Sequence, residues 1–238
     1  MRILGIDSST PGCSIALLNN DAVVAEQIAD PRPSHSKYLL QMVDQVLKRG
    51  ESLLDDVDGF AVTIGPGSFT GLRIGVSLLK GFVLATKKPF MGINSLEALA
   101  TTLNISKHPI CTVLDARKSE VYAAVFESQK GGLNPLLKES AYSPEALCEK
   151  IEVPALFAGC GVERYRETFK ERLGARFLES ETPSRFSTAA GAALLASRQF
   201  EHQKHFDLDQ LKINYIRKSE AELSLGKSLA ERRSNHGN

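Results

Sequence analysis

The sequence predicts an α/β protein built from two similar lobes, each a mixed β-sheet with flanking helices. Short, continuously apolar runs of strand length alternate with longer amphipathic segments of helix length. The order three strands, helix, strand, helix begins at the N-terminus and begins again near residue 108. In both halves the first strand ends in an aspartate, Asp7 and then Asp115. These observations together favour a duplicated domain.

The first half opens with three strands, and turn-forming residues separate them. Residues 3–6 are continuously apolar, as expected of a strand covered on both faces. Asp7-Ser8-Ser9-Thr10-Pro11-Gly12 is turn chemistry, and Ser34 has the character of an N-cap for a helix that Gly50 ends. The other predicted elements are strands at 13–18, 22–28, 59–64 and 90–93, and helices ending near 86 and at 103.

The second half repeats this order with weaker signals. Its predicted elements are strands at 110–114, 120–126, 136–140 and 155–158, a short helix from 143, and helices ending at 173 and near 198. A last apolar segment covers 211–216, and the rest is polar with mixed charge. We therefore expect an N-terminal lobe at 1–105, a C-terminal lobe at 106–218 and a mobile tail at 219–238.

Composition limits the classes of function. The chain has 238 residues and a net charge of +1, so it lacks an overall basic field for holding nucleic acid unaided. Its four cysteines form no C-x-x-C pair, which argues against a metal cluster and favours reduced thiols in the cytoplasm. No apolar run approaches the ~18 residues that cross a bilayer, so we expect no membrane association.

A glycine-rich loop between a strand and a helix is the most informative local feature. Glycines 65, 67 and 71 follow a buried strand, and the helix begins directly after this loop. A helix N-terminus attracts phosphate, but this spacing fits neither the dinucleotide nor the P-loop pattern. The alternative is a tight turn in which glycine allows close packing. The residues alone leave both interpretations open.

The duplicated fold resembles the actin, Hsp70 and sugar-kinase superfamily, whose lobes are ribonuclease-H-like. Within it, four motifs resemble the bacterial TsaB (YeaZ) family over nearly the whole chain: Gly5–Thr10, Gly65–Gly75, Leu114–Arg117 and Asn214–Arg217. The resemblance implies a subunit needed with TsaD and TsaE to form N6-threonylcarbamoyladenosine next to the anticodon of tRNAs reading codons that begin with A. It implies that TsaD transfers the group, and that this chain meets tRNA indirectly.

The same resemblance implies no catalytic residue and no metal. The paralogue TsaD carries Asn-His-Leu-Glu-Gly-His where this chain reads Asn94-Ser95-Leu96-Glu97-Ala98-Leu99, so both metal-binding histidines are replaced, by Ser95 and Leu99. We therefore expect an accessory protein and no enzyme. The alternatives are an ATP-dependent phosphotransferase of the same superfamily and a metallopeptidase-like protein.

A remnant of the superfamily's nucleotide cleft is expected at Asp7, Asp115, Gly159 and Gly161. Asp115 could serve phosphate or form a structural pair with Arg117 that closes a strand turn. No bound cofactor is expected in the chain alone, and ATP or ADP only at the interface of a complex.

The partner surface is expected on two helices of the N-terminal lobe. Their apolar arcs are together wider than one lobe needs, and such an excess marks an association site. We expect the chain to bind TsaD there and to form a homodimer through the same surface when TsaD is absent. The predicted interface residues are Leu39, Met42, Val43, Ile74, Leu78 and Phe82.

Overall fold

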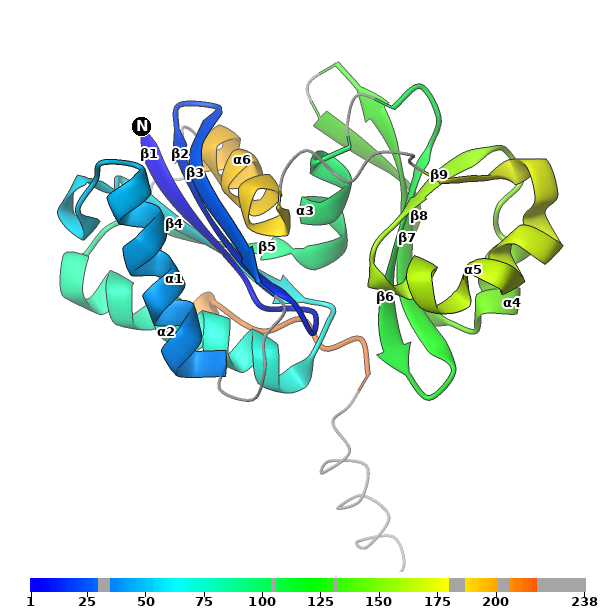
Figure 1. Cartoon of the computed structure of the whole chain (residues 1–238), viewed down its shortest axis with the longest axis horizontal. Helices are drawn as coiled ribbons and strands as arrows, with labels where there is room; N and C mark the ends of the chain where they lie inside the picture. The colour runs from blue at the N-terminus through cyan, green and yellow to red at the C-terminus, as the bar shows by residue number, and fades with distance from the viewer. Residues whose placement is uncertain (30–34, 104–105, 131, 180–186, 201–205, 218–238) are drawn as a thin grey trace, which may run out of the picture.

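The computed structural model describes residues 1–29, 35–103, 106–130, 132–179, 187–200 and 206–217. Two five-stranded sheets lie side by side, with strand orders β3-β2-β1-β4-β5 and β10-β9-β6-β7-β8 (Figure 1). In both, the first three strands of the half are antiparallel neighbours and the next two pair in parallel. The two halves therefore share one topology, and the predicted duplicated fold is confirmed.

The strands of the first sheet are β1 (Arg2–Asp7), β2 (Cys13–Asn19), β3 (Ala22–Ala29), β4 (Gly59–Gly65) and β5 (Phe90–Asn94). Those of the second are β6 (Ile110–Arg117), β7 (Glu120–Gln129), β8 (Gly132–Tyr142), β9 (Ala155–Ala158) and β10 (Phe177–Glu179). The helices are α1 (His35–Arg49), α2 (Phe69–Thr86), α3 (Ser95–Thr101), α4 (Pro144–Cys148), α5 (Cys160–Leu173) and α6 (Thr188–Phe200).

Helices cover both faces of the first sheet, which explains its continuous apolar strands. Leu4 and Ile6 of β1 point into a core shared with α1 and α2. Ile3, on the opposite face, packs in a second core with the alanines of α6. Successive side chains of a strand alternate between faces, so a strand with both faces covered must be apolar throughout.

Helix α6 lies on the first sheet, although it follows the second sheet in sequence. Small residues on both elements allow this close approach. The helix presents alanines, and a methyl group added at Gly5 of β1 would lie only 2.1 Å from the carbonyl oxygen of Ala189. At Gly191, an added methyl group would lie 2.0 Å from the carbonyl oxygen of Ala98 in α3. The prediction that 106–218 forms one lobe is therefore wrong for α6, which completes the first lobe.

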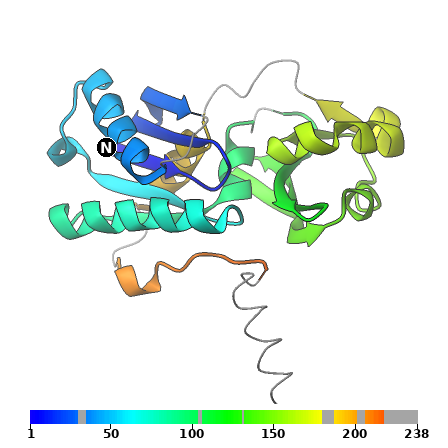
Figure 2. The ribbon, with the colours of Figure 1, turned by 60° about the horizontal axis from the view of Figure 1, so that its bottom comes forward.

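The last described segment, residues 206–217, also returns to the first lobe; we call it the strap. Phe206, Leu208, Leu211 and Ile213 pack against the core beneath α1 and α2, whereas Ile216 packs against the second sheet. Figures 1 and 2 show the strap, in orange, running from α2 toward the second lobe. The predicted tail at 219–238 lies outside the described residues.

Helix α3 lies between the lobes. It contacts β4, β5 and α6 of the first lobe and β6, β7 and β8 of the second. Leu96 and Ala100 share a core with Leu114 and Tyr122 on one face of the second sheet. The other face of that sheet is covered by α4 and α5.

One described helix, α2, is long and apolar enough by length and composition to cross a membrane, with a mean hydropathy of 1.3 over 18 residues. Its inner residues, however, pack on the first sheet, and 39% of this 18-residue stretch is buried. Arg73 and Ser77 are exposed on its other side. These are the properties of an amphipathic helix packed on a sheet.

Candidate functional site

The glycine-rich loop packs directly on the turn that follows β1. A methyl group at Gly67 would lie 2.2 Å from the carbonyl oxygen of Ser9, and one at Gly71 would lie 2.0 Å from that of Ser8. The backbone N–H of Ser68 donates to the carbonyl oxygen of Ser9 at 2.6 Å, and the Ser8 hydroxyl donates to that of Gly71 at 2.9 Å. The glycines therefore serve close packing, the second of the two interpretations.

The Asp7 carboxylate is used inside the fold. It is buried, and its Oδ1 accepts hydrogen bonds from the Ser9 backbone N–H at 3.0 Å and the Ser9 hydroxyl at 2.7 Å. The Thr63 hydroxyl of β4 donates to the same oxygen at 2.7 Å. Burial raises the pKa of Asp7, and these hydrogen bonds partly oppose that rise. Asp7 thus joins the β1 turn to β4.

The second strand-end carboxylate, Asp115, lies near the surface. Its Oδ1 accepts from the backbone N–H of Arg117 at 2.9 Å, and its Oδ2 pairs with Nη1 of Arg164 at 2.8 Å. The turn-closing interpretation is therefore supported through the backbone of Arg117, while the ion pair is made by a residue of α5. No local sequence signal identifies Arg164, because the pair depends on how α5 packs on β6.

Gly159 and Gly161 meet β6 beside Asp115. A methyl group at Gly159 would lie 2.3 Å from the carbonyl oxygen of Val113, and Gly159 also has a φ of +113°. At Gly161 it would lie 2.7 Å from Cγ1 of Val113. The structure thus brings Asp115 and both glycines together at the ends of β6 and β9, while Asp7 stays in the first sheet.

Helix α3 presents no metal-binding group at the two positions that the sequence singled out. Ser95 is 1% exposed and its hydroxyl oxygen has no hydrogen-bond partner among the described residues. Leu99 approaches Gly159 of the second lobe, 3.0 Å from where a methyl group there would lie. Within the described part of the chain, no group of three or more His, Cys, Asp or Glu side chains could hold a metal ion.

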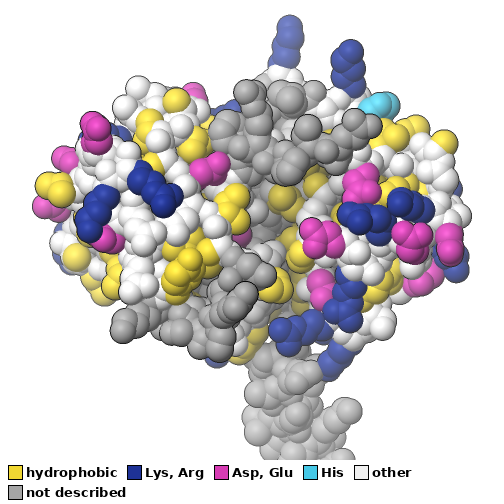
Figure 3. Space-filling view, in the orientation of Figure 1, with side chains coloured by type: hydrophobic (Ala, Val, Ile, Leu, Met, Phe, Trp, Pro, Cys, Tyr) yellow, Lys and Arg dark blue, Asp and Glu magenta, His cyan; other side chains and the backbone are white. Residues whose placement is uncertain are grey.

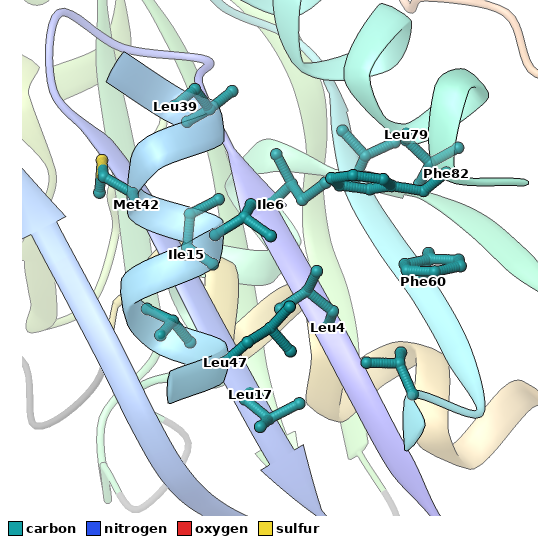
Figure 4. Packing of buried hydrophobic residues seen from close by; sticks show 14 of the residues in the cluster. Leu4, Ile6, Ile15, Leu17, Leu39, Met42, Leu47, Phe60, Leu79 and Phe82 are labelled. Atoms are coloured by element: carbon teal, nitrogen blue, oxygen red, sulfur yellow. The ribbon is translucent and has the colours of Figure 1, made fainter. Parts of the chain in front are cut away.

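Four of the six predicted interface residues are in the core. Leu39, Met42 and Val43 of α1 are at most 3% exposed, and Phe82 of α2 is 9% exposed. Figure 4 shows Leu39, Met42 and Phe82 among the side chains of this hydrophobic cluster. The Phe82 ring stacks on that of Phe60, with centroids 5.6 Å apart. The prediction is wrong for these four, because α1 and the sheet need the apolar arc that the sequence pattern assigned to a partner.

Apolar surface remains exposed on the outer face of α2. Ile74 and Leu78, the other two predicted residues, are half-buried at its margin. The outer face consists of Ile74, Ser77, Leu78, Gly81, Leu84 and Ala85. Leu84 is 60% exposed, and a methyl group at Gly81 would meet no atom within 4 Å. Small and apolar side chains therefore face outward along more than two turns.

Charges of both signs cover the face of the molecule seen in Figure 3, where Lys and Arg are interspersed with Asp and Glu. Ion pairs among the described residues include Arg166 with Glu179 at 2.6 Å and Lys48 with Asp44 at 2.8 Å. The described residues of this face thus form no extended patch of one sign that would attract nucleic acid over a long range.

The duplicated topology, with strand-end carboxylates in each lobe, defines a protein of the actin-like ATPase fold. Residues 23–224 match the family model described as TsaD, tRNA N6-adenosine threonylcarbamoyltransferase. A distant likeness in fold alone extends to a ROK hexokinase from Thermus thermophilus, with a TM-score of 0.51 at 11% identity.

Closer relatives narrow this class. The tRNA threonylcarbamoyladenosine biosynthesis protein TsaB of Bacillus subtilis is 30% identical over 226 residues, 93% of this chain and 96% of the relative. TsaB of Escherichia coli is 34% identical over 155 residues, 64% of this chain and 67% of the relative. The structure of YeaZ from Pseudomonas aeruginosa has a TM-score of 0.73 at 26% identity and covers 90% of this chain and 99% of its own. The chain belongs to the TsaB (YeaZ) family of tRNA threonylcarbamoyladenosine biosynthesis proteins.

Proposed function

We propose that this chain is the non-catalytic subunit of a complex with TsaD, acting with TsaE in the cytoplasm to form N6-threonylcarbamoyladenosine on tRNA. The observation that carries the proposal is the fate of the two strand-end carboxylates. Asp7 is bound by Ser9 and Thr63, and Asp115 by Arg164, so the fold itself uses the groups that related ATPases direct at nucleotide. The loss of both histidines from α3 supports an accessory role as well.

The outer face of α2 is the surface that we assign to TsaD. A helix that packs on one sheet needs a single apolar stripe, yet α2 keeps Leu84 and Ala85 exposed opposite its core residues. Ser77, Gly81 and Ala85 recur every four residues and lie along one side of the helix. Small side chains in such a row allow another helix to approach closely. A helix of the partner fits this face.

Gly81 strengthens this assignment. Glycine inside a helix is less favourable than alanine by about 0.8–1 kcal/mol. No atom of the described chain lies near enough to require glycine at this position. The monomer therefore gains nothing from Gly81, and close contact with a partner helix supplies the physical reason for it. The same face supports a homodimer when TsaD is absent.

The test is Leu84→Asp, with Val153→Asp as the matched control. Both side chains are more than half exposed, Leu84 at 60% and Val153 at 53%, so both variants should fold. Val153 precedes β9 in the second lobe, away from α2. Leu84→Asp should abolish binding to TsaD, homodimer formation and reconstituted tRNA modification, because it places an unpaired carboxylate in an apolar interface. Calorimetry and light scattering give the two affinities.

A Leu84→Asp protein that folds and still binds TsaD as tightly as the Val153→Asp control would overturn the assignment of this surface. ATP hydrolysis or metabolite phosphorylation by the lone chain would instead overturn the accessory role. We expect tRNA to bind the chain only within the complex, and ATP or ADP only at the interface of that complex.

A further inference from the structure

The strap is fixed to the first lobe by backbone and ring contacts. The backbone N–H of Asn214 donates to the carbonyl oxygen of Ile64 in β4 at 2.7 Å. The ring of Tyr215 lies 5.0 Å from that of Phe69, centroid to centroid, and its hydroxyl accepts from Nε of Arg73 at 3.1 Å. The motifs Gly65–Gly75 and Asn214–Arg217, far apart in sequence, therefore meet in space.

The same segment also binds the second lobe. The side-chain amide of Asn214 donates to Oε1 of Glu139 in β8 at 2.7 Å. Three residues later, Arg217 forms an ion pair with Glu120 of β7. The strap thus crosses from one lobe to the other within four residues, with a directional contact at each end.

Glu139 is the junction of these contacts. Its Oε2 accepts from the side-chain amide of Asn94, at the start of α3. The carbonyl oxygen of that amide caps α3, accepting from the backbone N–H of Leu96 at 2.8 Å and of Glu97 at 3.2 Å. Because the cap requires the oxygen to face the helix, the amide nitrogen must face Glu139.

A second carboxylate lies close to this junction. Burial, and then the negative charge of Glu139, raise the pKa of Glu97. Repulsion between the two carboxylates therefore works against the contact between lobes. The amide donors of Asn94 and Asn214 hold Glu139 in place against it.

The lobes also touch through the apolar side of α3, where Leu96 and Ala100 pack on the second sheet. Apolar contact has no preferred direction, so it allows one body to rotate on another, whereas hydrogen bonds fix an angle. We propose that Asn94, Glu139 and Asn214 form a clasp that fixes the orientation of the second lobe relative to the first, with α3 as the pivot.

Asn94→Asp in the full chain is the first test. The carboxylate keeps the cap of α3 but replaces the amide donor with a negative charge facing Glu139. Backbone hydrogen exchange in β8 and the strap should become about tenfold faster, since a hydrogen bond to a charged group is lost. Exchange in β1 and β2 should be unchanged, and X-ray scattering should give a larger radius of gyration. Asn19→Asp, the same substitution at the exposed end of β2, is the control.

A double variant separates the clasp from a general loss of stability. When Asn94→Asp is combined with Glu139→Gln, the amide introduced in β8 can donate to the carboxylate introduced at the start of α3. The oxygen of the same amide can still accept from Asn214. The charge has moved across the lobes. The hydrogen bond between positions 94 and 139 is rebuilt with reversed direction, and the one from Asn214 keeps its direction. Exchange and radius of gyration should return to those of the natural chain.

Glu139→Gln alone covers the case in which Asn94→Asp does not fold. It keeps the size of the side chain but sets two NH2 groups against each other, so exchange in β8 should be faster than in the natural chain. Exchange and scattering unchanged in the single variants would overturn the clasp. So would a double variant as perturbed as Asn94→Asp alone.

Discussion

The two halves of the chain place an aspartate at the same point of the same topology and then use it differently. Asp7 is buried and joins two strands of the first sheet through Ser9 and Thr63. Asp115 is near the surface and pairs with Arg164, whose side chain is 55% exposed. The comparison teaches that duplication preserved the backbone, whereas each half bound its carboxylate to the fold by separate means. The buried hydrogen bonds of Asp7 should contribute far more to stability than the ion pair of Asp115 with Arg164.

Gly71→Ala is the largest expected perturbation of the first half. The added methyl group would lie 2.0 Å from the carbonyl oxygen of Ser8, and both groups belong to constrained backbone. We expect a loss of about 3 kcal/mol or more in the free energy of unfolding, as for severe overpacking. Urea unfolding measures it. Gly81→Ala is the control on the same helix and should stabilise the monomer by about 0.8–1 kcal/mol, while weakening association.

Asp7→Ala should cause the next largest loss in the free energy of unfolding. It leaves the hydroxyls of Ser9 and Thr63 without their buried acceptor, which costs about 1–3 kcal/mol per unsatisfied group. Asp7→Asn, which keeps one acceptor oxygen, should lose less. If urea unfolding gave equal, small losses for both, the first carboxylate would be no more structural than the second.

The pH dependence of Asp7→Asn sharpens the comparison. The folded-state pKa of Asp7 is raised above its ordinary value of 3.8, chiefly by burial, so the folded state binds the proton more tightly than the unfolded state. That contribution to stability is fully present below pH 3.8 and is lost as the pH rises through the folded pKa. The stability difference between the natural chain and Asp7→Asn should therefore narrow as the pH rises above 3.8 and through the raised folded-state pKa of Asp7. A gap that widens with pH would contradict the raised pKa.

Arg164→Ala should have the smallest effect. The Arg164 side of its ion pair with Asp115 is open to solvent, and ion pairs at the surface contribute about 0–1 kcal/mol. A double-mutant cycle with Asp115→Ala gives the coupling energy at two salt concentrations. A coupling energy above about 1 kcal/mol would mean that Asp115 contributes as much to stability as Asp7 does.

The local pattern of the sequence predicts most of the fold. Strands β1 and β4 are continuously apolar and α2 is periodic, so their type and order follow from short segments. The return of α6 to the first sheet has no local signal, because an alanine-rich helix can pack on any close surface. Its small residues around Gly191 are the one hint that another element approaches closely.

The partner surface shows a different limit. An apolar arc on a helical wheel identifies which side chains avoid water, but not whether the sheet or a partner covers them. Phe82 and Leu84 differ by two positions, and the structure buries one against Phe60 and exposes the other. The strap contacts are missed for the same reason. Asn214 and Glu139 are ordinary polar residues until the fold brings them together.

The position of α6 has a consequence for synthesis on the ribosome. One face of the first sheet, which includes Ile3 and Ala61, is covered by the alanines of α6. Translation makes the N-terminal strands first, but this face lacks the cover that α6 provides until the segment Thr188–Phe200 has left the exit tunnel. The second sheet, which precedes α6, can form in the meantime. The lobe that begins the chain is therefore the last to be completed, and the nascent protein exposes an apolar sheet for most of its synthesis.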